Sequence, residues 1–164
     1  MYRATTLFIA CIMLISCNLI NLQSASEFLP RKGYVFVKKV VNLKKCFGAS
    51  CTTGKYTAVG SGFIVEITNE GSYVMTASHV CTENLAHYFP DAKINIRLQV
   101  ETLDGREYDA KLLKHDPHID ACLMFVENLV ANIEEVKLST TKPKEGDKVY
   151  NIASPYGIKY KNVV

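Results

Sequence analysis

The feature that most restricts the fold of this chain is a series of short β-type segments separated by turn signals. These segments share a content of β-branched and aromatic residues, and several alternate apolar with polar side chains. They span residues 33–41, 56–68, 72–77, 93–103, 106–116, 120–127 and 147–154. Six or seven such strands joined by turns predict an all-β fold, either a closed barrel or a sandwich.

Turn signals and one helical stretch complete the expected organisation. The cluster Thr-Asn-Glu-Gly at 68–71 predicts a hairpin between the second and third segments, and Asp104-Gly105 predicts another. Residues 82–89 favour one or two helical turns. No shift in composition marks a boundary after residue 32, so a chain of 164 residues is expected to form one domain.

The N-terminal stretch has the pattern of an export signal and is expected to lie outside the fold. Arg3 precedes an apolar run of signal-peptide length. Three alternatives stay open: cleavage after the small residues at 24–26, so that Glu27 begins the mature chain; cleavage and lipid attachment at Cys17, since "LISC" resembles a lipoprotein lipobox; or an uncleaved anchor extending to Leu22. Each predicts an exported protein, in contact with membrane only through this segment or a lipid.

Four cysteines follow that segment, and they predict disulfides. An even count in an oxidising compartment favours two bonds among Cys46, Cys51, Cys81 and Cys122, with three connectivities open. We favour Cys46 with Cys51, across the four residues between them. Their spacing does not match a zinc site, so no metal is expected.

Charge argues against a nucleic-acid partner. The formal net charge is only +3, and lysines are scattered in pairs such as 38–39, 44–45 and 142–144, without interleaved aromatic residues.

One histidine and one aspartate lie where a catalytic pair is expected. A general-base imidazole needs a carboxylate on its far ring nitrogen, which fixes the tautomer and stabilises the imidazolium. His79 follows the strand-like "VMTAS", and Asp120 opens an apolar strand after Pro117. Asp116 is the alternative carboxylate. His87, His115 and His118 lack a partner pattern and are interpreted as surface residues.

Four blocks in fixed order resemble the trypsin-like serine peptidases of the chymotrypsin fold, especially the HtrA-type branch. "GSGFIV" at 60–65 and "YVMTASHV" at 73–80 are similar to the family's Gly-Ser-Gly strand and Thr-Ala-x-His block. "KLLKHDPHIDACLMFVE" at 111–127 resembles the strand, turn and catalytic Asp that follow. "PKEGDKVYNIASPYGI" at 143–158 resembles the passage into a second barrel, although Ala153 stands where the family usually has Gly.

The resemblance implies a fold, an activity and a division of the chain. Residues 27–155 would form a single six-stranded Greek-key barrel, after a signal or anchor at 1–26 and before the start of a second barrel at 156–164. His79 would be the general base and acid and Asp120 its orienting carboxylate, in a cofactor-free endopeptidase that acts on peptides or proteins.

The same resemblance implies that the nucleophile lies elsewhere. The family's second barrel carries the nucleophile, the oxyanion hole and the specificity pocket, and no Gly-x-Ser-Gly-Gly block occurs here. None of Ser61, Ser78, Ser139 and Ser154 fits the role, and a cysteine nucleophile also stays open. We expect these residues alone to be inactive, whether they are a fragment, a decayed gene product or a retained module. The alternative function is a secreted or membrane-tethered β-barrel that binds a partner without catalysis.

Overall fold

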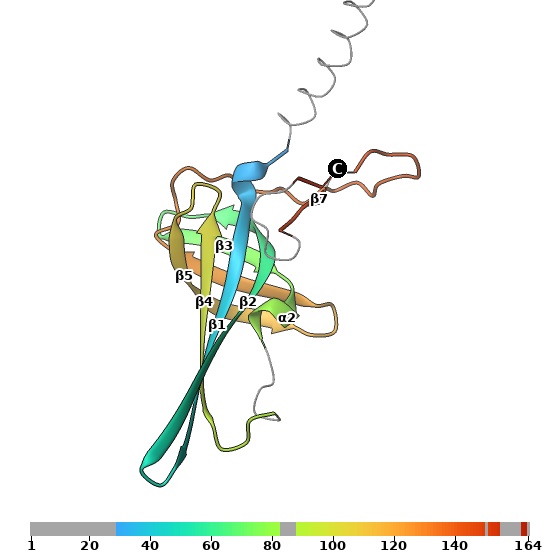
Figure 1. The fold of residues 1–164 in the computed structure, drawn as a ribbon. Helices are drawn as coiled ribbons and strands as arrows, with labels where there is room; N and C mark the ends of the chain where they lie inside the picture. The colour runs from blue at the N-terminus through green and yellow to red at the C-terminus, as the bar shows by residue number, and fades with distance from the viewer. Residues whose placement is uncertain (1–28, 83–87, 150, 155–161, 164) are drawn as a thin grey trace, which may run out of the picture.

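The described part of the chain is built almost entirely of β-strands. The computed structural model describes residues 29–82, 88–149, 151–154 and 162–163 (Figure 1). Its elements are η1 (Arg31–Gly33), β1 (Tyr34–Phe47), β2 (Ser50–Ile67), β3 (Gly71–Thr76), α2 (Ser78–Cys81), β4 (Lys93–Thr102), β5 (Glu107–Asp116), β6 (Ala121–Glu127), β7 (Asn151–Ile152) and β8 (Asn162–Val163). No helix among these residues is long and apolar enough to cross a membrane.

Strands β1 to β6 close into one antiparallel barrel in the order β1-β2-β3-β6-β5-β4. Consecutive strands pair within β1-β2-β3 and within β4-β5-β6, while β3 pairs with β6 and β1 with β4. This order is the Greek-key barrel that the sequence resemblance implies. Closure pairs every strand on both sides, so the barrel has no open edge.

Apolar side chains from the inner face of each strand fill the barrel. Alternation along β1 places Val35, Val37 and Val41 inside, where none of them is exposed to solvent. Val35 and Val37 belong to a core cluster that further contains Ile64, Val74, Val80, Cys81, Leu98, Val100, Cys122, Met124, Val126 and Leu129. The first six predicted strands are therefore confirmed, and their apolar faces are the ones that pack together.

The first hairpin continues past the barrel as an arm, which we define as residues 42–55 (Figure 1). β4 still pairs with β1 at 42–44, and only the tip of the arm has two strands. The sequence prediction ended one strand at residue 41 and began the next at 56, because the arm is polar and lacks apolar alternation. Backbone pairing nevertheless continues to Phe47 and Ser50, and Gly48 turns the chain with φ +58°. The favoured disulfide, Cys46–Cys51, is confirmed and joins directly paired residues near the tip.

One sequence prediction needs correction. The segment 147–154 is not a barrel strand: only Asn151–Ile152 is extended, and it pairs with β8 in a separate two-stranded sheet. The physical reason is that six strands already close the barrel, which leaves no edge for a seventh. Most of the helix predicted at 82–89 lies outside the described residues, since these exclude 83–87; the helical turn α2 that the structure describes spans Ser78–Cys81 and carries His79.

The segment after β6 returns to the barrel through a small polar network. Ser154 donates its backbone N–H to Ser61 Oγ at 3.0 Å, and the Tyr34 hydroxyl donates to Ser154 Oγ at 2.5 Å. Tyr34 and Ser154 are both buried. The network fixes this segment beside the start of β1.

Candidate active site

His79 lies in a single helical turn that follows β3 directly. Ala77 is extended, and the chain then turns through α2, with the Val80 N–H donating to the Ala77 carbonyl at 3.1 Å. The small residues Ala77 and Ser78 allow this abrupt change of direction, as the sequence suggested. Ser78 and Val80 are buried on either side of His79, so the imidazole is directed outward and its side chain is 73% exposed.

Asp120 is presented by the turn between β5 and β6. Its backbone is left-handed, with φ +50°, a conformation that aspartate tolerates better than most residues. Its carbonyl accepts the Ser78 N–H at 3.1 Å, which ties this turn to the start of α2. The contact between the two backbones brings the carboxylate beside His79.

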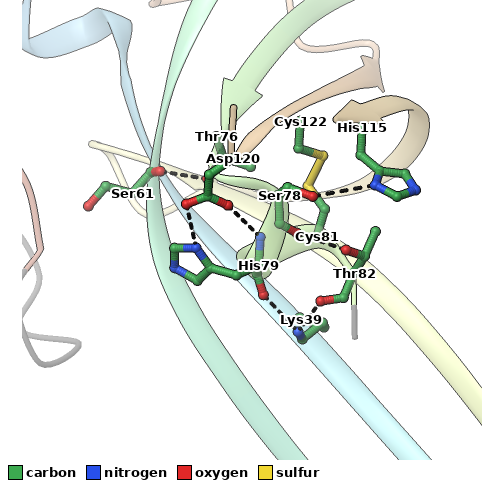
Figure 2. The surroundings of a disulfide bond; sticks show 10 residues. All are labelled: Lys39, Ser61, Thr76, Ser78, His79, Cys81, Thr82, His115, Asp120 and Cys122. Atoms are coloured by element: carbon green, nitrogen blue, oxygen red, sulfur yellow. Dashed lines mark hydrogen bonds and ion pairs between the residues drawn. A yellow bond between two sulfur atoms is a disulfide. The ribbon is translucent and has the colours of Figure 1, made fainter. Parts of the chain in front are cut away.

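One carboxylate holds both the backbone and the ring of the histidine (Figure 2). Asp120 Oδ1 accepts the His79 backbone N–H at 3.0 Å, and Oδ2 lies 2.8 Å from Nδ1. With Nδ1–H donating to the carboxylate, the neutral ring keeps its lone pair on Nε2, the atom that a general base uses. The structure thus brings together the two residues that the sequence singled out.

These hydrogen bonds hold the pKa of Asp120 below its ordinary value of 3.8. The backbone N–H of His79 is the largest cause, and the ring hydrogen bond is the next. Because the folded-state pKa is lowered, the favourable pairing is present above the ordinary pKa and is lost as the pH falls through the lowered one. Asp120 is therefore a carboxylate throughout the range in which a histidine can act as a base.

The pair is open to solvent, unlike the buried carboxylate that general-base chemistry favours. Asp120 has a 51% exposed side chain, and His79 is more exposed still. Water screens the attraction between them, so geometry rather than a low dielectric defines this pair.

Lys39 is a site residue that the sequence prediction missed. Its side chain is directed into the barrel end, with 2% of the residue exposed, and Nζ donates to the carbonyls of His79 and Thr82 at 3.1 Å each. These carbonyls lie at the C-terminal end of α2, where a cation is favourable. The alternation of Val35, Val37 and Val41 could have identified Lys39 as an inward residue of the same strand.

A disulfide fastens the same turn from the other side (Figure 2). Cys81 and Cys122 are bonded, and they lie two residues after His79 and Asp120 respectively. The bond joins α2 to the first residues of β6. The relative position of the two catalytic candidates is therefore fixed covalently as well as by hydrogen bonds.

Among the described residues, the rival carboxylate Asp116 and the histidines His115 and His118 have no hydrogen bond to the ring of His79. Asp116 Oδ1 accepts the His118 backbone N–H at 2.9 Å, as a turn residue would. His115 and His118 are exposed, although His115 Nδ1 lies 3.4 Å from Ser78 Oγ. His87 lies outside the described residues.

The four serines considered in the sequence make hydrogen bonds to groups other than His79. Ser61 Oγ accepts the Ser154 N–H, Ser78 Oγ contacts His115, and Ser139 Oγ donates to the Thr141 carbonyl at 2.9 Å. Ser154 Oγ accepts the hydroxyl of Tyr34.

Comparisons with known proteins place this geometry in a family. The model of the trypsin-like peptidase domain matches residues 60–164. A probable periplasmic serine endoprotease, DegP-like, from Buchnera aphidicola subsp. Baizongia pistaciae (strain Bp) is 34% identical over 127 residues, covering 75% of this chain and 24% of the relative. A DegP-like protein of Marinomonas sp. (strain MWYL1) is 37% identical over 108 residues, covering 65% and 20%.

The periplasmic serine endoprotease DegP of Escherichia coli (strain K12) is 29% identical over 105 residues, covering 63% of this chain. The chain spans about a quarter or less of the length of these relatives. The region matched by the family model begins within β2 and includes α2 with His79 and the Asp120 turn. The chain belongs to the trypsin-like serine peptidases, in their HtrA-type branch.

Proposed function

We propose that this chain is the base-carrying barrel of an exported serine endopeptidase, with His79 as general base and acid and Asp120 as its orienting carboxylate. The observation that carries the proposal is the grip of one carboxylate on both the backbone N–H and Nδ1 of His79. A histidine that served only as a surface residue would not need its tautomer and its backbone fixed together.

In the proposed reaction, Nε2 of His79 takes the proton of a nucleophile as it attacks the scissile carbonyl of a peptide. The ring becomes an imidazolium, which the ionised Asp120 stabilises, and it then gives the proton to the leaving amine. Lys39 and the Cys81–Cys122 bond hold α2 in place during these transfers. No cofactor takes part in this scheme.

The nucleophile, serine or cysteine, is proposed to come from a second barrel outside these 164 residues. Activation requires a hydroxyl or thiol within hydrogen-bond reach of Nε2. The serines considered above, at positions 61, 78, 139 and 154, make other contacts. A second barrel would also cover the exposed pair and supply the oxyanion hole. Residues 27–155 would then be the first barrel and 156–164 the start of the second.

Two measurements test this proposal. Reading the gene downstream of codon 164 should give an in-frame Gly-x-Ser-Gly block or its cysteine equivalent. The purified 164-residue chain should leave a labelled casein substrate intact, while the extended product cleaves it and His79→Ala abolishes that cleavage. If the 164-residue chain cleaves casein and His79→Ala abolishes that cleavage, the proposal that the nucleophile lies outside these residues is wrong.

A second candidate is a binding module without catalysis, favoured by an apolar hollow on the barrel. This cavity of about 320 Å³ is lined largely by Leu29, Pro30, Phe63, Val136 and Ile152. Apolar pockets of this size suit a peptide side chain or a partner protein. A stop codon after residue 164, together with a cellular protein of matching mass, would favour this candidate over the peptidase.

Export is also proposed, because the matched relatives are described as periplasmic and the N-terminal stretch reads as a signal. The three processing alternatives make different products. Mass spectrometry of the protein from cells separates them: a chain beginning at Glu27, a lipid-modified chain beginning at Cys17, or an intact N-terminus. Cys17→Ala should remove the lipid only in the second case.

A further inference from the structure

The outer face of the arm gathers lysines that are far apart in the sequence. Antiparallel pairing places Lys44 directly opposite Lys93 of β4 on one side and Thr53 of β2 on the other. The neighbouring row on the same face joins Asn95, Asn42 and Lys55 in the same way. Two rows of three side chains thus cross three strands, and all six residues are exposed.

These two rows line a hollow of about 880 Å³. Between them runs a third row, Ile94, Leu43 and Gly54, which completes the lining. The polar lining residues offer three ammonium groups, two amides and one hydroxyl, all able to donate hydrogen bonds. Carboxylates do not contribute to the lining.

The grouping of these lysines is electrostatically unfavourable when no anion is bound. Like charges directly opposite on paired strands destabilise a sheet, and Lys44 faces Lys93 in that position. The sequence contains no Asp or Glu between residues 28 and 65 to offset them, and Asp91, just before β4, is the nearest acidic residue along that strand. Within the described part of the chain, no ion pair joins Lys44, Lys55 or Lys93 to a carboxylate.

The Cys46–Cys51 disulfide holds the outer end of this hollow. Cys46 and Cys51 lie two residues beyond Lys44 and Thr53 on the same face, whereas Lys45 lies on the opposite face. Beyond the Lys44–Lys93 pair β4 ends, and the remaining ribbon has two strands, which alone are only marginally stable. The covalent bond therefore helps to maintain the register of β1 with β2 beside the lysines.

We propose that the hollow formed by Lys44, Lys55 and Lys93 binds a phosphate or sulfate group. Ammonium groups and neutral donors without a competing carboxylate are the chemistry that such an anion requires. The group could belong to a soluble ester or to a lipid headgroup. The site lies on the arm, apart from His79 and Asp120, and does not depend on the proposed peptidase activity.

Titration of the full chain with pyrophosphate, followed by amide NMR, tests the proposal. We expect saturable shifts confined to 42–44, 53–55 and 93–95, with Lys44→Gln and Lys93→Gln each weakening binding about tenfold. Lys45→Gln is the matched control, because it removes the same charge from the same arm but from the other face, and it should change the affinity less than twofold. Equal weakening by Lys44→Gln and Lys45→Gln, or shifts that do not saturate, would overturn the site.

Thermal unfolding shows whether Lys44→Gln weakens anion binding only because it destabilises the fold. Without anion, Lys44→Gln should have a Tm equal to or above that of the parent chain, because it relieves the repulsion from Lys93. At one fixed concentration, pyrophosphate should raise the Tm of the parent and of Lys45→Gln by more than it raises that of Lys44→Gln. A Tm lowered by Lys44→Gln without anion would show that the lysine serves the fold and would contradict the proposal.

Vesicles distinguish the two sources of the anion. The fraction of protein that sediments with phosphatidylglycerol vesicles is measured for Lys44→Gln and for Lys45→Gln. Because both variants carry the same N-terminal segment, a difference between their sedimented fractions is due to the arm. Loss of sedimentation only in Lys44→Gln assigns a lipid headgroup, while equal sedimentation together with pyrophosphate binding assigns a soluble ester. Failure of Lys44→Gln to differ from Lys45→Gln with both probes would refute the site.

Discussion

Two disulfide-bonded regions of this chain differ in how much of the fold holds them. The turn of His79 is fixed by Cys81–Cys122, by the buried Lys39 and by the Asp120 carboxylate, which come from three separate elements. The arm rests on the pairing of β1 with its neighbours and on Cys46–Cys51. The first region positions the two proposed catalytic side chains, whereas the second holds an exposed surface. The same type of covalent bond therefore supports a many-sided tertiary contact in one region and a locally paired hairpin in the other.

The largest expected effect is on the catalytic pair itself. In the polypeptide that includes the nucleophile, Asp120→Asn should lower kcat/KM about 10⁴-fold, because an amide favours the wrong histidine tautomer. Asp116→Asn is the matched control, since Asp116 caps a turn four residues earlier in the chain, and it should cost less than tenfold. Similar losses in the two variants would mean that Asp120 has no special role.

Removing the Cys81–Cys122 disulfide beside the proposed active site should have the next largest effect, on stability. Cys81→Ala with Cys122→Ala opens a loop of 41 residues' separation and should lower the free energy of unfolding by about 4 kcal/mol in the chain-entropy model. Urea unfolding measures this loss. If the midpoint does not move, the hydrogen bonds of α2 alone hold the site.

The bond of the arm should matter less for global stability. Cys46→Ala with Cys51→Ala opens a loop with a separation of only 5 residues, for which the same model gives a loss of about 2 kcal/mol. Hydrogen exchange should quicken within 42–55 and stay unchanged around His79. Faster exchange at α2 in this variant would show that the two regions are coupled.

The smallest effect is expected for Lys39. Lys39→Met keeps an inward apolar stem but leaves the carbonyls of His79 and Thr82 without their donor, at a cost of about 1–2 kcal/mol. The pKa of Asp120, followed by carboxyl NMR, should return toward 3.8 as α2 loosens. Lys44→Met, on the exposed face of the same strand, is the control and should leave the pKa of Asp120 unchanged. An equal change of this pKa in both variants would contradict a specific role of Lys39 in the site.

Local patterns were sufficient for much of this architecture. The β-branched segments predicted the barrel strands, and Asp104-Gly105 predicted a hairpin whose turn has Gly105 at φ +83°. His79 and Asp120 were identified because each lies at a strand end with a recognisable flank. The errors fell where local patterns are weak: segment 147–154 has strand-like composition, but the barrel offered no edge for it to join.

The sequence by itself determined the alternation that buries one face of each strand, the turns between strands and the family to which the chain belongs, because these depend on neighbours along the chain. Only the tertiary structure decided that Lys39 caps the turn of His79, that Cys81 meets Cys122, and that Lys44 faces Lys93. Each of these contacts joins residues from different strands or turns, and barrel closure and register, which no single segment encodes, bring them together.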